Sequence, residues 1–153
     1  MNIAAPYRFV YSKNNATNND LRKMIAKAIP ISMQQSKEFS KKFKGKTDRQ
    51  TAKNIYNFLK SLKYVKDGEN QKIKTIRVLV KDGSGDCKSY TVATSAILKN
   101  LGIPHYIVYT SYNKADATPS HVYVQLKDGT IIDAVYKAFN KEAPYAYKFR
   151  KSA

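Results

Sequence analysis

The chain has 153 residues, 42% hydrophobic and 12% aromatic, which argues against disorder throughout and allows one domain with a single core. Its 28 Lys and Arg against 11 Asp and Glu give a net charge of +17, which favours acidic partners or, more simply, reflects a well-solvated surface. One cysteine, Cys87, excludes an intramolecular disulfide framework, and with two histidines it excludes a Cys-rich zinc site.

The chain shows neither a basic start followed by an apolar run nor an apolar run of about 18 residues. We therefore predict a protein without a membrane segment or secretory signal, located in the cytoplasm, or in the virion if the source is a phage. No cofactor is expected. Residues 1–19 are predicted to form an N-terminal arm, and residues 20–153 a single domain without internal repeats.

The first half of the domain is predicted to be mostly helical. "DLRKMIAKAI" should end at Pro30, and "SMQQSKEFSKKFKG" should form a second helix ending at Gly45. "TDRQ" has the pattern of a capping box at Thr47, and beyond it an apolar stripe recurs at helical spacing: Ile55, Phe58, Leu59 and Leu62. "IKTIRVLV" is predicted to be a strand or extended segment.

The second half begins with a helix from Asp86 that is buried along its length and ends at Gly102. Three β-rich segments follow, "HYIVYTSY", "SHVYVQLK" and "TIIDAVY", the last two joined by an Asp-Gly turn typical of a hairpin. The basic tail "YAYKFRKSA" should either cover a sheet edge or be mobile. Helices followed by a run of strands predict an α+β fold.

Cys87 stands at the start of the predicted helix, where two interpretations compete. A thiol attacks only as thiolate, and a helix N-terminus stabilises negative charge. Asp86 is a suitable N-cap, the Cys87 N–H could donate to an oxyanion, and the preceding Gly85 would let a substrate backbone approach. Otherwise Cys87 is a small apolar residue in a buried helix.

A nucleophile needs a base and a group that orients the base, and His121 and Asp133 are the candidates. If Asp128-Gly129 forms a two-residue turn, Asp133 faces Val124 and lies three residues out of register with His121. A longer loop or a bulge would bring them closer. Taken alone, His121 is a surface residue, whereas a buried Asp133 requires a partner such as a histidinium.

Together, "IYNFLKSLKY", "GSGDCKSYTVATSAILKNLGIPHYIV", "HVYVQL" and "GTIIDAVY" resemble the transglutaminase-like branch of the papain-like superfamily, over about residues 47–136. The resemblance implies a papain-like core in which N-terminal helices and the nucleophile helix pack on an antiparallel sheet. It makes Cys87 the nucleophile, His121 the base and Asp133 the orienting group. Such a triad forms an acyl-enzyme from a peptide, glutamine amide or isopeptide bond, which water hydrolyses or a lysine amine converts to a cross-link.

The chain departs from the family pattern in ways that favour hydrolysis over cross-linking. Lys88 stands where the family usually has an acidic residue, and Val122 where an aromatic one is common. There is no tryptophan for the oxyanion, so Tyr64 is the candidate hydroxyl donor, and no calcium site is visible. The expected partner is a peptide or protein substrate, with an acidic one favoured by the net charge.

Two other functions fit the sequence. The fold could serve as a structural component of a larger assembly, such as a phage virion or nucleoprotein particle; a Cys87 buried from solvent, or a His121 beyond hydrogen-bond reach, would favour this alternative. The segment "KEFSKKFKGK" could make non-specific nucleic-acid contacts that weaken steeply with salt.

Overall fold

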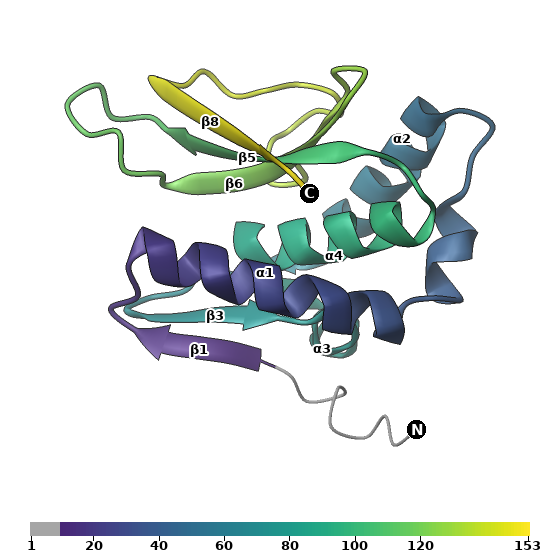
Figure 1. The fold of residues 1–153 in the computed structure, drawn as a ribbon, viewed down its shortest axis with the longest axis horizontal. Coiled ribbons are helices and arrows are strands. Elements are labelled where there is room, and N and C mark those ends of the chain that lie inside the picture. Colours follow the sequence, from purple (N-terminus) through teal and green to yellow (C-terminus); the bar gives the residue numbers. More distant parts are fainter. Residues whose placement is uncertain (1–9) are drawn as a thin grey trace.

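The computed structural model describes residues 10–153, and its centre is the helix that begins at Cys87. This helix, α4, lies between a four-stranded antiparallel sheet on one side and α1 with a two-stranded ribbon on the other (Figure 1). The elements in chain order are β1 (Val10–Asn14), α1 (Asn18–Gln35), the 3₁₀ helix η2 (Phe39–Phe43), α2 (Asp48–Lys60), β2 (Lys63–Tyr64), β3 (Asn70–Lys74), α3 (Ile76–Asp82), β4 (Ser84–Gly85), α4 (Cys87–Asn100), β5 (His105–Ser111), β6 (His121–Leu126), β7 (Ile131–Ile132) and β8 (Tyr147–Ser152).

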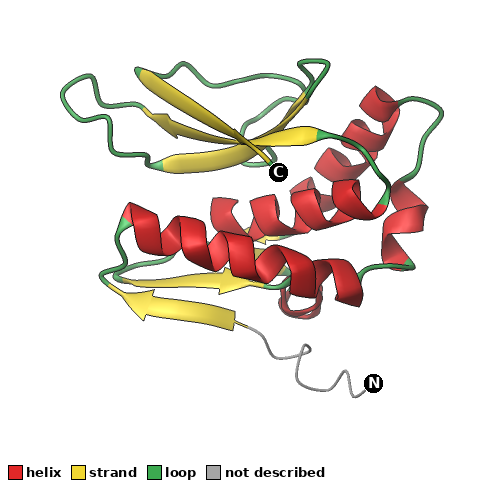
Figure 2. Cartoon of the chain, viewed as in Figure 1, coloured by secondary structure: helices red, strands yellow, loops and turns green. Residues whose placement is uncertain are grey.

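Short strands lie between the helices in the first part of the chain, and the four strands of the large sheet all follow the last helix. Figure 2 shows this sheet on one side of the helices. Its strand order is β7-β6-β5-β8, while β1 pairs with β3 and β2 pairs with β4. The predicted α+β class is confirmed. None of the helices in the described part of the chain is long and apolar enough to cross a lipid bilayer.

The helix α1 runs through Pro30 to Gln35, so the prediction that it ends at Pro30 was wrong. Proline removes one helical hydrogen bond, but tertiary contacts on both sides of it hold the helix together. Ile29 is buried, and one turn later the buried Ser32 hydroxyl accepts from the Ile76 N–H at 3.0 Å. The second predicted helix is reduced to η2 (Phe39–Phe43).

The predicted start of α2 at Thr47 is confirmed, with one difference. The Thr47 hydroxyl accepts from the Gln50 N–H at 3.1 Å, but the Gln50 side chain donates to Asn54 Oδ1 at 2.9 Å and does not reach back. The expected apolar stripe does face the core, since Ile55 and Leu59 are buried there. A complete capping box occurs instead at the start of α1.

"IKTIRVLV" is not a single strand, and that prediction was wrong. Its first part ends β3, and from Ile76 the chain forms the helix α3, which ends at Gly83 in the left-handed region (φ 67°). A short apolar run does not distinguish a buried strand from a buried helix by itself. Here Ile76 and Leu79, three residues apart, both pack into the core, which selects the helix.

The β6–β7 hairpin has a three-residue loop in place of the predicted two-residue turn. The Leu126 N–H donates to the Thr130 carbonyl at 2.8 Å, and Gly129 within the loop has φ 99°. Val124 therefore pairs with Ile132. The C-terminal tail pairs with β5 as β8 and covers that edge of the sheet, the first of its two predicted states.

Part of the predicted N-terminal arm is secondary structure. Residues 10–14 form β1, which pairs antiparallel with β3, and α1 begins at Asn18. The rest of the arm, residues 1–9, lies outside the described residues. The boundary between arm and domain at residue 20 stays a prediction.

Gly85, immediately before the N-cap of α4, should not tolerate a side chain. A Cβ at this position would lie 2.6 Å from Leu79 Cδ1, in the fully buried core, and 3.3 Å from Ser89 Cβ. We expect Gly85→Ala to lower the free energy of unfolding by about 1–3 kcal/mol, measured by urea denaturation. Gly68→Ala is the matched control, because nothing lies within 4 Å of its Cβ position; equal effects of both variants would contradict this packing role.

Candidate active site

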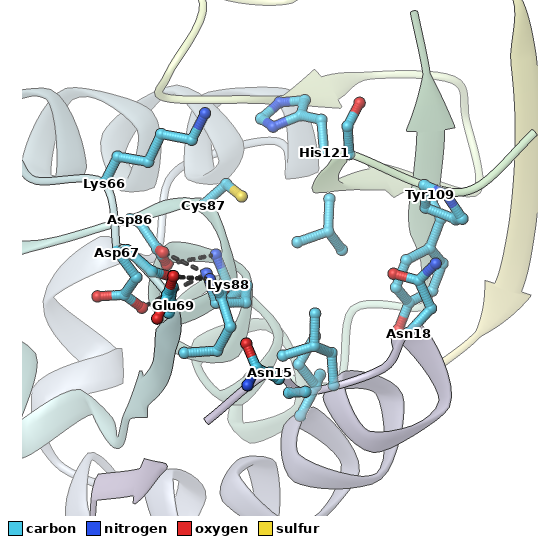
Figure 3. Close-up of a pocket in the computed structure, with 18 of the residues that line it drawn as sticks. Asn15, Asn18, Lys66, Asp67, Glu69, Asp86, Cys87, Lys88, Tyr109 and His121 are labelled. Carbon is cyan, nitrogen blue, oxygen red and sulfur yellow. Dashed lines mark hydrogen bonds and ion pairs between the residues drawn. The ribbon is translucent and has the colours of Figure 1, made fainter. Parts of the chain in front are cut away.

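Cys87 is the first residue of α4 and is partly exposed. The Asp86 carboxylate caps the helix by accepting from the Lys88 N–H at 3.0 Å, as the sequence predicted. The thiol lines a pocket of about 450 Å³ that is also lined by His121 and by the start of α1 (Figure 3). The nucleophile candidate thus lines a pocket and is partly accessible.

The structure brings His121 and Asp133 together. His121 Nε2 lies 2.7 Å from Asp133 Oδ2, and both side chains are largely buried. The other Asp133 oxygen accepts from the Val135 N–H at 3.2 Å. With Nε2 engaged by the carboxylate, Nδ1 is the imidazole nitrogen left for Cys87.

The three-residue loop is the reason that this pair can form. In the predicted two-residue turn Asp133 faces Val124, on the face of β6 opposite to His121. In the structure Ile132 faces Val124, so one step further Asp133 comes opposite Tyr123, whose side chain shares a face with His121. A register change of one residue converts two side chains on opposite faces into a hydrogen-bonded pair.

The surroundings of His121 favour its protonated form. Burial alone would lower the pKa of the imidazole, but the hydrogen bonds to Asp133 and Cys87, together with the charges of these two groups, outweigh burial and raise the pKa to about 9. The imidazole is therefore a cation at neutral pH in a site that also holds a thiol.

Tyr64, the predicted hydroxyl donor, lies beside the nucleophile. It pairs with Gly85 in the parallel β2–β4 ladder and lines the pocket. Burial and the nearby charges of Cys87 and Asp86 raise the pKa of its hydroxyl, which stays protonated and able to donate at neutral pH. Gly85 itself is buried against Leu79, so the structure gives it a packing role, and its predicted role toward substrate stays a prediction.

Lys88 forms a buried ion cluster at the N-terminus of α4. Its ammonium contacts the Asp86 carboxylate and lies 3.5 Å from Asp67 Oδ2 (Figure 3). Burial raises the pKa of Asp86, against the opposing charge of Lys88. Asp67 also accepts from the Lys72 N–H at 2.8 Å. Lys88 therefore ties the loop between β2 and β3, one wall of the pocket, to the nucleophile helix.

The pocket does not share the positive charge of the chain. Among its lining residues the fixed cations Lys66 and Lys88 stand against the carboxylates of Asp67, Glu69 and Asp86. Counting only the Lys, His, Asp and Glu side chains that line the pocket, the charges balance when His121 is an imidazolium, although the whole chain carries +17. The excess positive charge lies outside the pocket.

Sequence reasoning missed two tyrosines at the site. The ring of Tyr112 is stacked near the His121 imidazole and that of Tyr123 is tilted toward it. Tyr123 could have been found, because it lies two residues after His121 in the same strand and so shares its face. Tyr112 and the Asp67 carboxylate had no comparable signal, since both come from loops.

One of three comparisons with known proteins finds a match. The sequence model of the transglutaminase-like superfamily matches residues 37–149, a wider span than residues 47–136, over which the motifs resemble the family. The chain belongs to the transglutaminase-like superfamily. Membership suggests cysteine-dependent acyl transfer or protease-like activity. Searches of curated proteins and of solved structures find no match.

Removing the cation of the buried cluster should destabilise the fold. Lys88→Met leaves the carboxylates of Asp86 and Asp67 close together without a counter-charge, and we expect a loss of about 3–5 kcal/mol at neutral pH. Urea denaturation measures it, with Lys41→Met, which removes an exposed pair with Glu38, as the control. A Lys88→Met loss no larger than that of the control would contradict the cluster's role.

The two histidines should titrate on opposite sides of the ordinary value of 6.5. His121, with a pKa of about 9, stabilises the fold below about pH 6.5, and this contribution, on the order of 3 kcal/mol, is lost as pH rises through about 9. Burial lowers the pKa of His105, whose Nε2 lies 2.8 Å from the Ser95 hydroxyl, so its contribution is lost as pH falls below about 6.5.

NMR of the imidazole Cε1–H groups between pH 4 and 10 measures both titrations. His121→Gln assigns the signals, because the chain has only two histidines. A His121 signal that titrates at or below 6.5 would contradict the electrostatics of the site.

Proposed function

We propose that this protein is a cysteine-dependent amidase or peptidase acting through Cys87, His121 and Asp133. The observation that carries the proposal is the His121–Asp133 hydrogen bond, at 2.7 Å, beside a thiol at a helix N-terminus. A purely structural role would be favoured by a Cys87 buried from solvent or a His121 beyond reach. Cys87 is instead partly exposed, lines the same pocket as His121, and helps to raise the pKa of the His121 imidazole.

The reaction begins with a thiolate–imidazolium pair. The Cys87 thiolate attacks the amide carbonyl carbon, and the negative charge moves to the carbonyl oxygen. The carbon–nitrogen bond then breaks as the His121 imidazolium gives its proton to the leaving amine, which leaves a thioester. Neutral His121 takes a proton from water, the water oxygen attacks the thioester, and the carboxylic acid leaves with Cys87 restored.

Two donors support the oxyanion in this proposal. The first N–H groups of a helix have no partner within the helix, and in the described part of the chain the Cys87 N–H has none elsewhere. The Tyr64 hydroxyl, protonated and beside Cys87, is the second. A preorganised pair of this kind lowers the barrier because it faces the charge that develops in the transition state.

Hydrolysis is the variant we favour. The chain has no tryptophan, which many cross-linking members of the family use for the oxyanion. The substrate in this proposal is a peptide or protein amide. Because the Lys, His, Asp and Glu charges of the pocket balance, an acidic partner surface would contact basic residues outside the pocket, while the scissile segment needs no negative charge.

Mass spectrometry of Cys87 tests this function. The protein is incubated with a library of peptides rich in glutamine, with and without a primary amine, and then analysed intact. We expect a thioester adduct on Cys87 and a hydrolysed peptide, with little amide product when the amine is added. Cys87→Ala should lose the adduct and at least about 10³-fold of the activity, with unchanged thermal unfolding.

Cys87→Ser is the matched variant, because it keeps the size and hydrogen bonding of the side chain. Hydrolysis at the wild-type rate by folded Cys87→Ala would overturn the proposal. A product formed mainly with the amine would assign the transferase reaction instead.

A further inference from the structure

Two tyrosine rings lie against the imidazole of His121 at small interplanar angles. The ring of Tyr112, which follows β5, has its centroid 6.2 Å from that of His121 at 29°. The ring of Tyr123, in β6, is 5.4 Å away at 30°. Neither tyrosine lines the pocket of about 450 Å³; Tyr123 lines only a small cavity behind the site, together with Cys87 and Asp133.

The hydrogen bond to Asp133 does not by itself fix the imidazole plane. It holds one atom, Nε2, and the terminal torsion of a histidine side chain is broad, so the ring could swing about that bond. Ring faces close to parallel with the imidazole restrict this swing. They also favour its protonated form, because the face of an aromatic ring attracts a cation.

The Tyr123 ring is anchored from the far end of the chain. Its hydroxyl donates to the Glu142 carboxylate, which Lys148 of β8 holds through an ion pair at 3.0 Å. Tyr123 is buried, with 3% of its surface exposed. The C-terminal strand is therefore linked to the imidazole through three side chains.

Tyr112 is held by the backbone around it. It is 48% exposed, but it follows the last residue of β5, and the hairpin is closed there by the Ser120 N–H, which donates to the Thr110 carbonyl at 2.9 Å. The loop beyond it is tied by the Ser111 hydroxyl, which donates to the Asp116 carbonyl at 2.6 Å. The ring is thus presented to His121 from a restrained loop.

We propose that Tyr112 and Tyr123 are positioning residues that hold the imidazole of His121 in the plane in which Nε2 meets Asp133 and Nδ1 faces Cys87. The proposal rests on the proposed function of His121 as the base. Its consequence is that the reactivity of Cys87 depends on two rings that lie outside the pocket of about 450 Å³. A displacement of about 1 Å at such a site can cost about 10²-fold in rate.

The proposal can be tested with two measurements that require no amide substrate. The first is the rate of Cys87 alkylation by iodoacetamide between pH 5 and 9, and the second is the NMR resonance of the His121 Nε2 proton. We expect Tyr112→Leu and Tyr123→Leu to slow alkylation near pH 7 by about tenfold and to broaden the Nε2 proton signal through faster exchange with water. Tyr112→Phe keeps the ring and should keep both readouts within about twofold of wild type. Tyr123→Phe keeps the ring but loses its hydrogen bond to Glu142, so its readouts should lie between those of wild type and Tyr123→Leu.

Phe149→Leu is the control for Tyr112→Leu, because the Phe149 ring is about as exposed as that of Tyr112 (44% against 48%) and packs on Tyr109. If Tyr123→Leu does not fold, the proposal is tested by Tyr112→Leu alone, because Tyr112 is exposed. A folded leucine variant with wild-type alkylation and an unchanged Nε2 proton signal overturns the proposal, as does a phenylalanine variant as slow as its leucine counterpart. Alkylation requires no acyl transfer. The alkylation rates can therefore be interpreted even if the proposed function fails its own test.

Discussion

The burial of α4 is the constraint on which the other features depend. Every residue of this helix from Lys88 to Leu98 is buried, between the large sheet and the layer formed by α1 and β3. A helix buried on all sides cannot shift along its axis without opening two core clusters at once. Its first residue, Cys87, is therefore a fixed point, and the strands that carry the other site residues pack against the same helix.

The polar groups at the start of α4 follow from that burial. A helix N-terminus in the interior needs partners for its free N–H groups, and Asp86 supplies one. A buried carboxylate then needs a counter-charge, which Lys88 provides together with a contact to Asp67. Where the family usually has an acidic residue, this chain has a cation that compensates two carboxylates. Lys88 therefore compensates the carboxylates locally, at the start of α4.

The C-terminal region contributes more to the site than its sequence indicates. The strand β8 covers one edge of the sheet, and its Lys148 reaches the Tyr123 hydroxyl through Glu142. At least one basic residue of this strand, Lys148, therefore helps to hold the ring that packs on the imidazole. The net positive charge of the chain is carried by residues outside the pocket, away from the reacting groups.

The sequence by itself determined the local features. The start of α4 at Asp86, the apolar stripe of α2 and the existence of the β6–β7 hairpin all follow from neighbouring residues, because caps, periodicity and turns act over a few positions. The same short range explains the errors at Pro30 and in "IKTIRVLV", where contacts with distant segments outweigh local preference. Tertiary structure decided the rest. The register of β6 and β7 differs by one residue from that of a two-residue turn, which puts Asp133 on the same face as His121, and Asp67 and Tyr112 reach the site from loops. Those placements depend on packing between segments far apart in the chain, which no local pattern encodes.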